Sequence, residues 1–126
     1  MEKKRASIAI VTGASSGMGR EFVRQIAESY RSISEIWVIA RREQALLTLQ
    51  EELKDKTTIR TLPMDLAEKD ACAELAALLK KEKPVIRILV NSAGLGHAGK
   101  LETQDVDQIL NMIDVNCRAL TAVTMT

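Results

Sequence analysis

The segment 12–19, with the sequence TGASSGMG, constrains the fold more than any other part of this chain. An apolar run at residues 8–11 precedes it, and a pattern typical of an amphipathic helix follows it. Glycines let a backbone turn tightly and approach a ligand closely, while a helix N-terminus presents free N–H groups and a partial positive charge. A strand, a glycine-rich turn and a helix in this order therefore predict a site for the pyrophosphate of a dinucleotide. A plain turn followed by a helix is the alternative interpretation.

The glycines of this segment are spaced G-x-x-x-G-x-G, which differs from the G-x-G-x-x-G of the general dinucleotide fingerprint. We expect them to serve the turn, the approach of the pyrophosphate and the packing of the helix on the strand. The two serine hydroxyls and the methionine backbone are expected to contact phosphate or ribose. The predicted contact residues are Gly13, Ser15, Ser16, Gly17, Met18 and Gly19.

Strand and helix patterns alternate from end to end, which predicts an α/β fold with a parallel sheet and helices on both faces. Residues 36–39 and 88–90 are continuous apolar runs, as expected for strands covered on both faces. Residues 58–62 alternate instead, which suits a strand at the edge of the sheet. The predicted strands are 7–12, 35–40, 58–63 and 87–91.

Apolar residues at helical spacing mark four helices between and after these strands. Thr103-Gln104-Asp105 supplies capping chemistry at the start of the last helix, and Pro84 ends the third. The residues expected on the apolar faces are Phe22, Val23, Ile26 and Ala27; Leu46, Leu49 and Leu53; Ala71, Leu75, Leu78 and Leu79; and Val106, Ile109, Leu110, Ile113, Cys117 and Leu120.

Composition and charge exclude several classes of partner. The net charge is +1 with both signs interspersed, and there are only three aromatic residues, so neither a nucleic acid nor an acidic membrane is an expected partner. No apolar run approaches the ~18 residues of a membrane span. Cys72 and Cys117 lack the spacing of a metal site, which predicts two reduced packing residues in a cytoplasmic protein.

With its leading threonine, the glycine segment resembles the T-G-x-x-x-G-x-G turn of the short-chain dehydrogenase/reductase family. Three further motifs follow in the order of that family: Asp65 after the third strand, Asn91-Ser92-Ala93-Gly94 after the fourth, and Val115-Asn116 in the next helix. The resemblance runs from residue 8 to the end of the chain. It implies a Rossmann-type doubly wound parallel sheet in the order 3-2-1-4, with the C-terminal strands absent.

The same resemblance assigns roles to these later residues. Asp65, with Leu66 beside it, is similar to the aspartate that contacts the adenine amino group. A helix N-cap is the alternative for Asp65, because Glu68 follows at capping-box spacing, and both can hold. In the second motif Asn91, Ala93 and Gly94 are the implied cofactor contacts, and Ser92 departs from the family's second asparagine. Asn116 matches the family's catalytic asparagine, which holds a water for proton delivery.

The end of the second strand bears on the choice of cofactor. A cofactor without a 2′-phosphate favours a carboxylate here, and Ala40 stands where NAD-preferring members of the family carry one. Arg41 stands where NADP-preferring members carry a basic residue, and a guanidinium can bind a 2′-phosphate through two hydrogen bonds. The alternative is that Arg41 and Arg42 are ordinary exposed residues at the start of the second helix. Cations are slightly unfavourable there, because the N-terminal end of a helix carries a partial positive charge.

The family's catalytic tyrosine and lysine have no counterpart in these 126 residues. That pair is Tyr-x-x-x-Lys, C-terminal to the asparagine matched by Asn116. The only tyrosine is Tyr30, and Ser34 stands four residues after it. Residues 1–126 are therefore interpreted as one NADP-binding Rossmann domain, truncated before the catalytic pair.

The expected activity is that of an NADP(H)-dependent oxidoreductase, with hydride passing between nicotinamide and a small carbonyl or alcohol substrate. A non-catalytic dinucleotide-binding or interaction module is the alternative. The fourth strand should be central in such a sheet, yet no later strand is present to pair with it. Either a partner chain or a further part of the same protein is expected to cover residues 88–90. In the family the counterpart of the last helix commonly packs against a second subunit, so the resemblance implies a homo-oligomer.

Overall fold

The computed structural model describes residues 5–92, 105–107, 110 and 124. Strands and helices alternate in the described part of the chain, as the sequence predicts. They are β1 (Ser7–Thr12), α1 (Gly17–Ser29), β2 (Glu35–Ala40), α2 (Glu43–Leu53), β3 (Thr58–Pro63), α3 (Lys69–Glu82) and β4 (Val85–Asn91).

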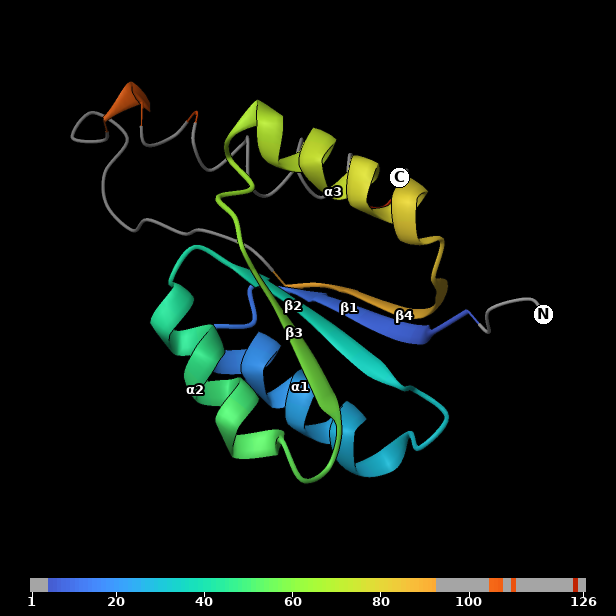
Figure 1. Ribbon diagram of the computed structural model, residues 1–126. Coiled ribbons are helices and arrows are strands. Elements are labelled where there is room, and N and C mark those ends of the chain that lie inside the picture. The colour runs from blue at the N-terminus through green and yellow to red at the C-terminus, as the bar shows by residue number, and fades with distance from the viewer. Residues whose placement is uncertain (1–4, 93–104, 108–109, 111–123, 125–126) are drawn as a thin grey trace.

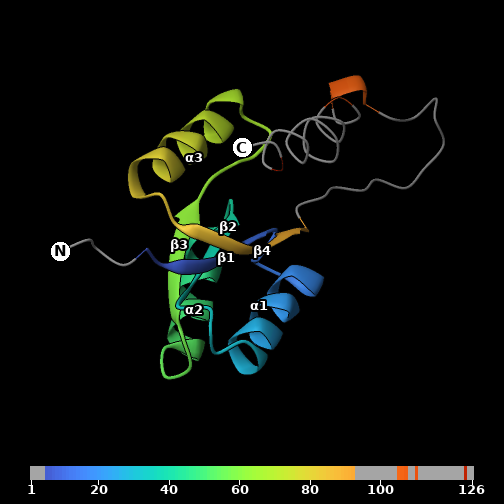
Figure 2. The ribbon, with the colours of Figure 1, turned by 90° about the vertical axis from the view of Figure 1, so that its right-hand side faces the viewer.

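The four strands form one parallel sheet in the order β3-β2-β1-β4, which confirms the predicted topology. Helices α1 and α2 cover one face of this sheet and α3 covers the other (Figure 1). Turned by 90°, the sheet is seen between these two helical layers (Figure 2). The fold is the doubly wound α/β arrangement expected from the alternating pattern.

Alternation along the strands lets the same strands build two cores, one on each face of the sheet. Ala9 and Val11 of β1 face the α1 and α2 side, where they pack with residues such as Leu46 and Leu49. Ile8 and Ile10 face α3, where they pack with Leu75. Successive side chains of a strand point to opposite faces, so a continuous apolar run serves both layers at once. No helix among the described residues is long and apolar enough to cross a membrane.

The predicted bounds of the first three strands are confirmed, but the fourth begins at Val85 rather than at residue 87. Pairing with β1 recruits the two extra residues, because the Val85 N–H donates to the Ala6 carbonyl at 2.7 Å and Val85 lies opposite Ser7. The end of α3 is as predicted: Lys83 takes a left-handed conformation with φ 48°, and Pro84 follows it.

The predicted apolar face of α1 is wrong at one residue. Val23 and Ile26 are buried, whereas Phe22 is 41% exposed. The stripe that meets the sheet is centred on Val23 and Ile26, and Phe22 lies beyond its margin. The predicted faces of α2 and α3 are confirmed at Leu46, Leu49, Leu53, Ala71 and Leu75, and Leu78 and Leu79 pack partly buried against the same core.

Candidate dinucleotide site

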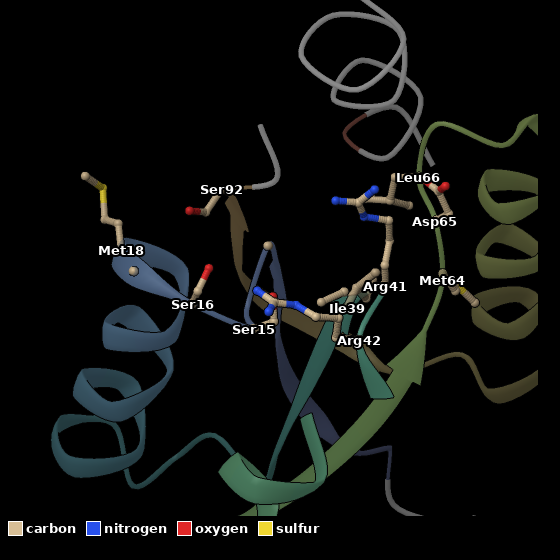
Figure 3. Close-up of a pocket in the computed structure, with 13 residues that line it drawn as sticks. Ser15, Ser16, Met18, Ile39, Arg41, Arg42, Met64, Asp65, Leu66 and Ser92 are labelled. Atoms are coloured by element: carbon tan, nitrogen blue, oxygen red, sulfur yellow. The ribbon is translucent and has the colours of Figure 1, made fainter. Parts of the chain in front are cut away.

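A cavity of about 580 Å³ opens at the carboxyl ends of the strands. Four segments contribute to it: the β1–α1 turn, the end of β2, the β3–α3 loop and the end of β4 (Figure 3). The strand order reverses at β1, and ligands of open α/β sheets bind at such a point. The lining residues are Gly13, Ser15, Ser16, Gly17, Met18, Ile39, Ala40, Arg41, Arg42, Met64, Asp65, Leu66 and Ser92.

The three predicted glycines shape the turn in different ways. Gly13 and Gly17 have φ values of 66° and 56°, the left-handed region in which a side chain is strained. A Cβ built on Gly17 meets nothing within 4 Å, so this position keeps the cavity open. A Cβ on Gly19 would lie 2.1 Å from the Gly13 carbonyl oxygen, so Gly19 lets helix α1 pack against the turn from behind.

Helix α1 begins at the cavity with its backbone donors uncapped. Ser16 is the N-cap residue in an extended conformation, and its side chain makes no capping hydrogen bond. The first turn also contains no acidic side chain. The free N–H groups and the positive end of the helix dipole are therefore directed at the cavity without a neutralising partner in the described turn. Such an end suits an anion.

Thr12 ties the glycine turn to the end of β4. It is 1% exposed, and its hydroxyl accepts a hydrogen bond from the Ser92 N–H at 3.0 Å and donates to the Val90 carbonyl at 3.4 Å. Ser92 is thereby held beside the cavity that it lines. In the sequence this threonine is recognised only as the first residue of the glycine motif, and no hydrogen bonds are assigned to it. A polar residue at the end of a buried apolar strand was the feature that could have indicated them.

The two arginines lie where the sequence places them, directly after β2. Both are exposed, and Arg42 is the N-cap residue of α2. In Figure 3 the Arg42 side chain points toward Ser15, and the Arg41 side chain points toward Leu66 and Asp65. Among the described residues neither guanidinium has an ion-pair partner. Two unpaired cations at a cavity mouth provide a site for an anionic group.

Asp65 is not the N-cap of the third helix, so this alternative from the sequence is wrong. Helix α3 begins at Lys69 with Glu68 as its N-cap, three residues later than expected. Asp65 instead closes the preceding turn: its Oδ1 accepts from the Ala67 N–H at 3.0 Å, and its carbonyl accepts from the Glu68 N–H at 2.9 Å. Such local bonds are typical of aspartate in turns. They fix the carboxylate beside the cavity.

The remaining predicted residues do not all meet at this cavity. Gly19 lies behind the turn rather than in the lining, and Asn91 does not line the cavity either. The Asn91 amide donates to the Thr124 hydroxyl at 2.8 Å, so it links the end of β4 to the last segment of the chain. Ala93, Gly94 and Asn116 lie outside the described residues.

Four residues of the lining were not among the predicted contacts: Ile39, Ala40, Met64 and Ser92. Ala40 and Ser92 were singled out only as departures from a family pattern. Ile39 was expected only in a strand, and Met64 was interpreted as a core filler. Met64 packs against the α3-side core and also lines the cavity, because it stands at the point where β3 leaves the sheet. Within the described residues no cluster of histidine, cysteine and carboxylate side chains could hold a metal ion.

The sequence matches the model of the short chain dehydrogenase family over residues 7–126. It is 39% identical over 114 residues to a short chain dehydrogenase of Pseudocercospora fijiensis. The matched segment covers 88% of this chain and 36% of that protein. It is 34% identical over 121 residues to sulfoacetaldehyde reductase 2 of Chromohalobacter salexigens. Here the matched segment covers 94% of this chain and 46% of that protein.

A solved structure supports the same relationship. The short-chain dehydrogenase from Sphingobium yanoikuyae, in complex with NADPH, superposes with a TM-score of 0.84 at 27% identity and covers 94% of this chain and 46% of its own. The chain thus spans less than half the length of these three proteins. The match to the family model, the sheet order and the glycine turn agree, and the chain belongs to the short chain dehydrogenase family.

Proposed function

We propose that this chain binds NADP(H) and serves an oxidoreductase that transfers hydride between nicotinamide and a small carbonyl or alcohol. One observation carries the proposal: a single cavity joins the open N-terminus of α1, two exposed arginines and a carboxylate. When bound, the dinucleotide supplies the carbon that donates or accepts hydride. The residues of this chain bind and orient it.

The described residues fit such a molecule. The N-terminus of α1 and the open space above Gly17 accommodate the pyrophosphate, since no Cβ blocks its approach. Arg41 and Arg42 provide cations for a 2′-phosphate, and Ala40 leaves the end of β2 without a carboxylate that would repel it. The Sphingobium relative, solved in complex with NADPH, supports this choice of cofactor.

The outer part of the cavity suits an adenine ring. Leu66 supplies an apolar surface, and the fixed Asp65 carboxylate has lone pairs left to accept from an adenine amino group. Asn91, Ala93 and Gly94 are proposed to support the ribose, and Asn116 to hold a water for proton delivery. These last four assignments rest on the family motifs.

Binding without turnover is the expected behaviour of the purified 126-residue chain. It should bind NADPH, yet reduce no ketone or aldehyde, because no Tyr-x-x-x-Lys is present to move the proton. NADPH fluorescence measures the binding, and its loss over time in the presence of a carbonyl panel measures turnover. Gly17→Trp, which fills the open space above the turn, is the control. Turnover above this control contradicts the proposal, and so does a failure to bind NADPH.

A further inference from the structure

We infer that Gln50 closes the β3 edge of the sheet to strand pairing, so that copies of this chain pair only through β4 and stop at a dimer. Strands β3 and β4 are the two outermost strands of the described sheet. An outermost strand presents a row of backbone N–H and C=O groups with which another strand can pair. The two edges of this sheet differ in how far these groups are already occupied.

Alternate residues of β3 present their backbone groups to the outside of the sheet. The N–H of Met64, directly after β3, donates to the Ala40 carbonyl of β2 at 2.9 Å. Successive residues of a strand direct these groups to opposite sides, so the even-numbered residues of β3 bond toward β2. The backbone groups of Ile59, Thr61 and Pro63 therefore face outward, where no strand of the described sheet lies.

The Gln50 side chain of α2 reaches this outer edge. Leu49 and Leu53 of the same helix pack into one core with Ile59, which holds α2 against β3 (Figure 1). The Gln50 Nε2 donates to the Ile59 carbonyl at 2.8 Å, and the bond is partly buried. The glutamine amide thus takes the place of the N–H that an added strand would offer. A strand could pair here only by displacing it.

Residue type limits the rest of the β3 edge. Pro63 has no N–H to offer a partner strand, and proline within a sheet is typical of an edge. In the described part of the chain, Thr61 is then the one outward-facing residue of β3 whose N–H and C=O are both open. A single residue cannot support the ladder of hydrogen bonds that strand pairing needs.

The β4 edge has no such cover among the described residues. The side chain that bonds its backbone is Thr12, which comes from β1 on the inner side of the strand. With β4 alone open, two copies can pair β4 to β4 around a two-fold axis, and this contact leaves no further open edge. If β3 were open as well, β3 of one copy could pair with β4 of the next, and copies would add without limit.

Sedimentation velocity of the 126-residue chain tests the inference. Gln50→Met keeps the length of the side chain and removes the donor, and Gln44→Met makes the same exchange at an exposed site of α2 as the control. Across a micromolar concentration series we expect wild type and Gln44→Met to reach a dimer and no further. Gln50→Met should form larger species that grow with concentration. Adding Ile86→Lys to Gln50→Met should end this growth at a dimer, because a lysine closes the β4 edge.

Circular dichroism confirms that each variant is folded. A Gln50→Met chain that sediments as wild type does overturns the inference. Equal growth of Gln44→Met, or growth that survives Ile86→Lys, overturns it too, because apolar contacts and not strand edges would then drive association. A wild type that stays monomeric, or that grows beyond the dimer, also overturns it.

A measurement on the wild type keeps the inference testable where Gln50→Met does not fold. Hydrogen exchange of the glutamine side-chain amides, followed by NMR, reports the bond to the Ile59 carbonyl directly. We expect the Gln50 amide to exchange about 2- to 10-fold more slowly than that of the exposed Gln44, as one hydrogen bond allows. Equal rates would show that Gln50 does not occupy this edge, and the inference would be wrong.

Discussion

Individual backbone positions decide the shape of the cavity. Gly13 and Gly17 adopt the left-handed conformation that the turn requires. Gly19 is needed because a side chain at this position would collide with the backbone of Gly13. The sequence predicts these three positions because glycine spacing is a local signal. The hydrogen bonds of Thr12 could not be predicted in the same way, since they join residues about 80 positions apart. Only the fold brings such partners together.

The close backbone contact behind Gly19 leaves no room for a side chain at this position. Gly19→Ala should lower the free energy of unfolding by about 1–3 kcal/mol and weaken NADPH binding, because the new Cβ collides with backbone that cannot move aside. Gly17→Ala is the matched control: it adds about 1–2 kcal/mol of left-handed strain but no collision. Urea unfolding measures both. If Gly19→Ala unfolds no more easily than wild type, the close contact is absent in solution.

Elements are joined by ion pairs on the α1 and α2 side of the sheet. Arg24 of α1 donates two hydrogen bonds to Glu52 of α2, at 2.8 and 2.9 Å, and Lys56 pairs with Glu28. The hydrogen bonds from Arg24 hold the pKa of Glu52 below its ordinary value of 4.5. Lys56 lowers the pKa of Glu28 in the same way. The amphipathic patterns predict these helices, but not which exposed side chains pair between them.

These pairs give stability a defined pH dependence. A carboxylate with a lowered pKa stabilises the folded chain above pH 4.5, and this contribution is lost as the pH falls through the lowered value. Glu52→Gln should therefore lower the melting temperature at pH 7, and the difference from wild type should vanish in acid. Glu51→Gln is the control, because in the described part of the chain Glu51 pairs with the nearby Lys54 and with no residue of α1. A difference that persists unchanged below the lowered pKa contradicts the assigned ion pair.

The first two residues of β4 could not be predicted from the local sequence. The bounds of the strands at 7–12, 35–40 and 58–63 were predicted correctly. Pro84 directly precedes Val85, but it was interpreted as the end of the third helix, and the local pattern did not place Val85 and Ile86 in the following strand. These two residues belong to the strand because they pair with the parallel strand β1, whose backbone N–H and C=O groups hydrogen-bond with theirs.

For the whole molecule, the sheet order leaves β4 at one edge of the described chain. Along it Ile86 is 44% exposed, and Arg87 is the only charged residue of the strand. Proteins usually protect a strand edge with charge or cover it with another element. Within residues 5–92 nothing pairs with the outer side of β4, so this edge favours association with another strand.

We therefore expect the purified chain to self-associate at micromolar concentration. Ile86→Lys should shift sedimentation toward the monomer, because a lysine on an edge strand disfavours strand pairing. Leu47→Lys, which changes an exposed leucine of α2, should leave the association unchanged. A monodisperse wild-type monomer with a cooperative melt contradicts the prediction and indicates a finished domain.

We propose that the cavity at the strand ends binds NADP(H) in preference to NAD(H). The most direct test is the pair of dissociation constants of NADPH and NADH for the wild-type chain, measured by fluorescence in one buffer. We expect NADPH to bind about 10- to 100-fold more tightly, since one charge-assisted bidentate contact to the 2′-phosphate contributes roughly 1.5–3 kcal/mol. Equal affinity for the two dinucleotides, or binding of neither, would contradict it.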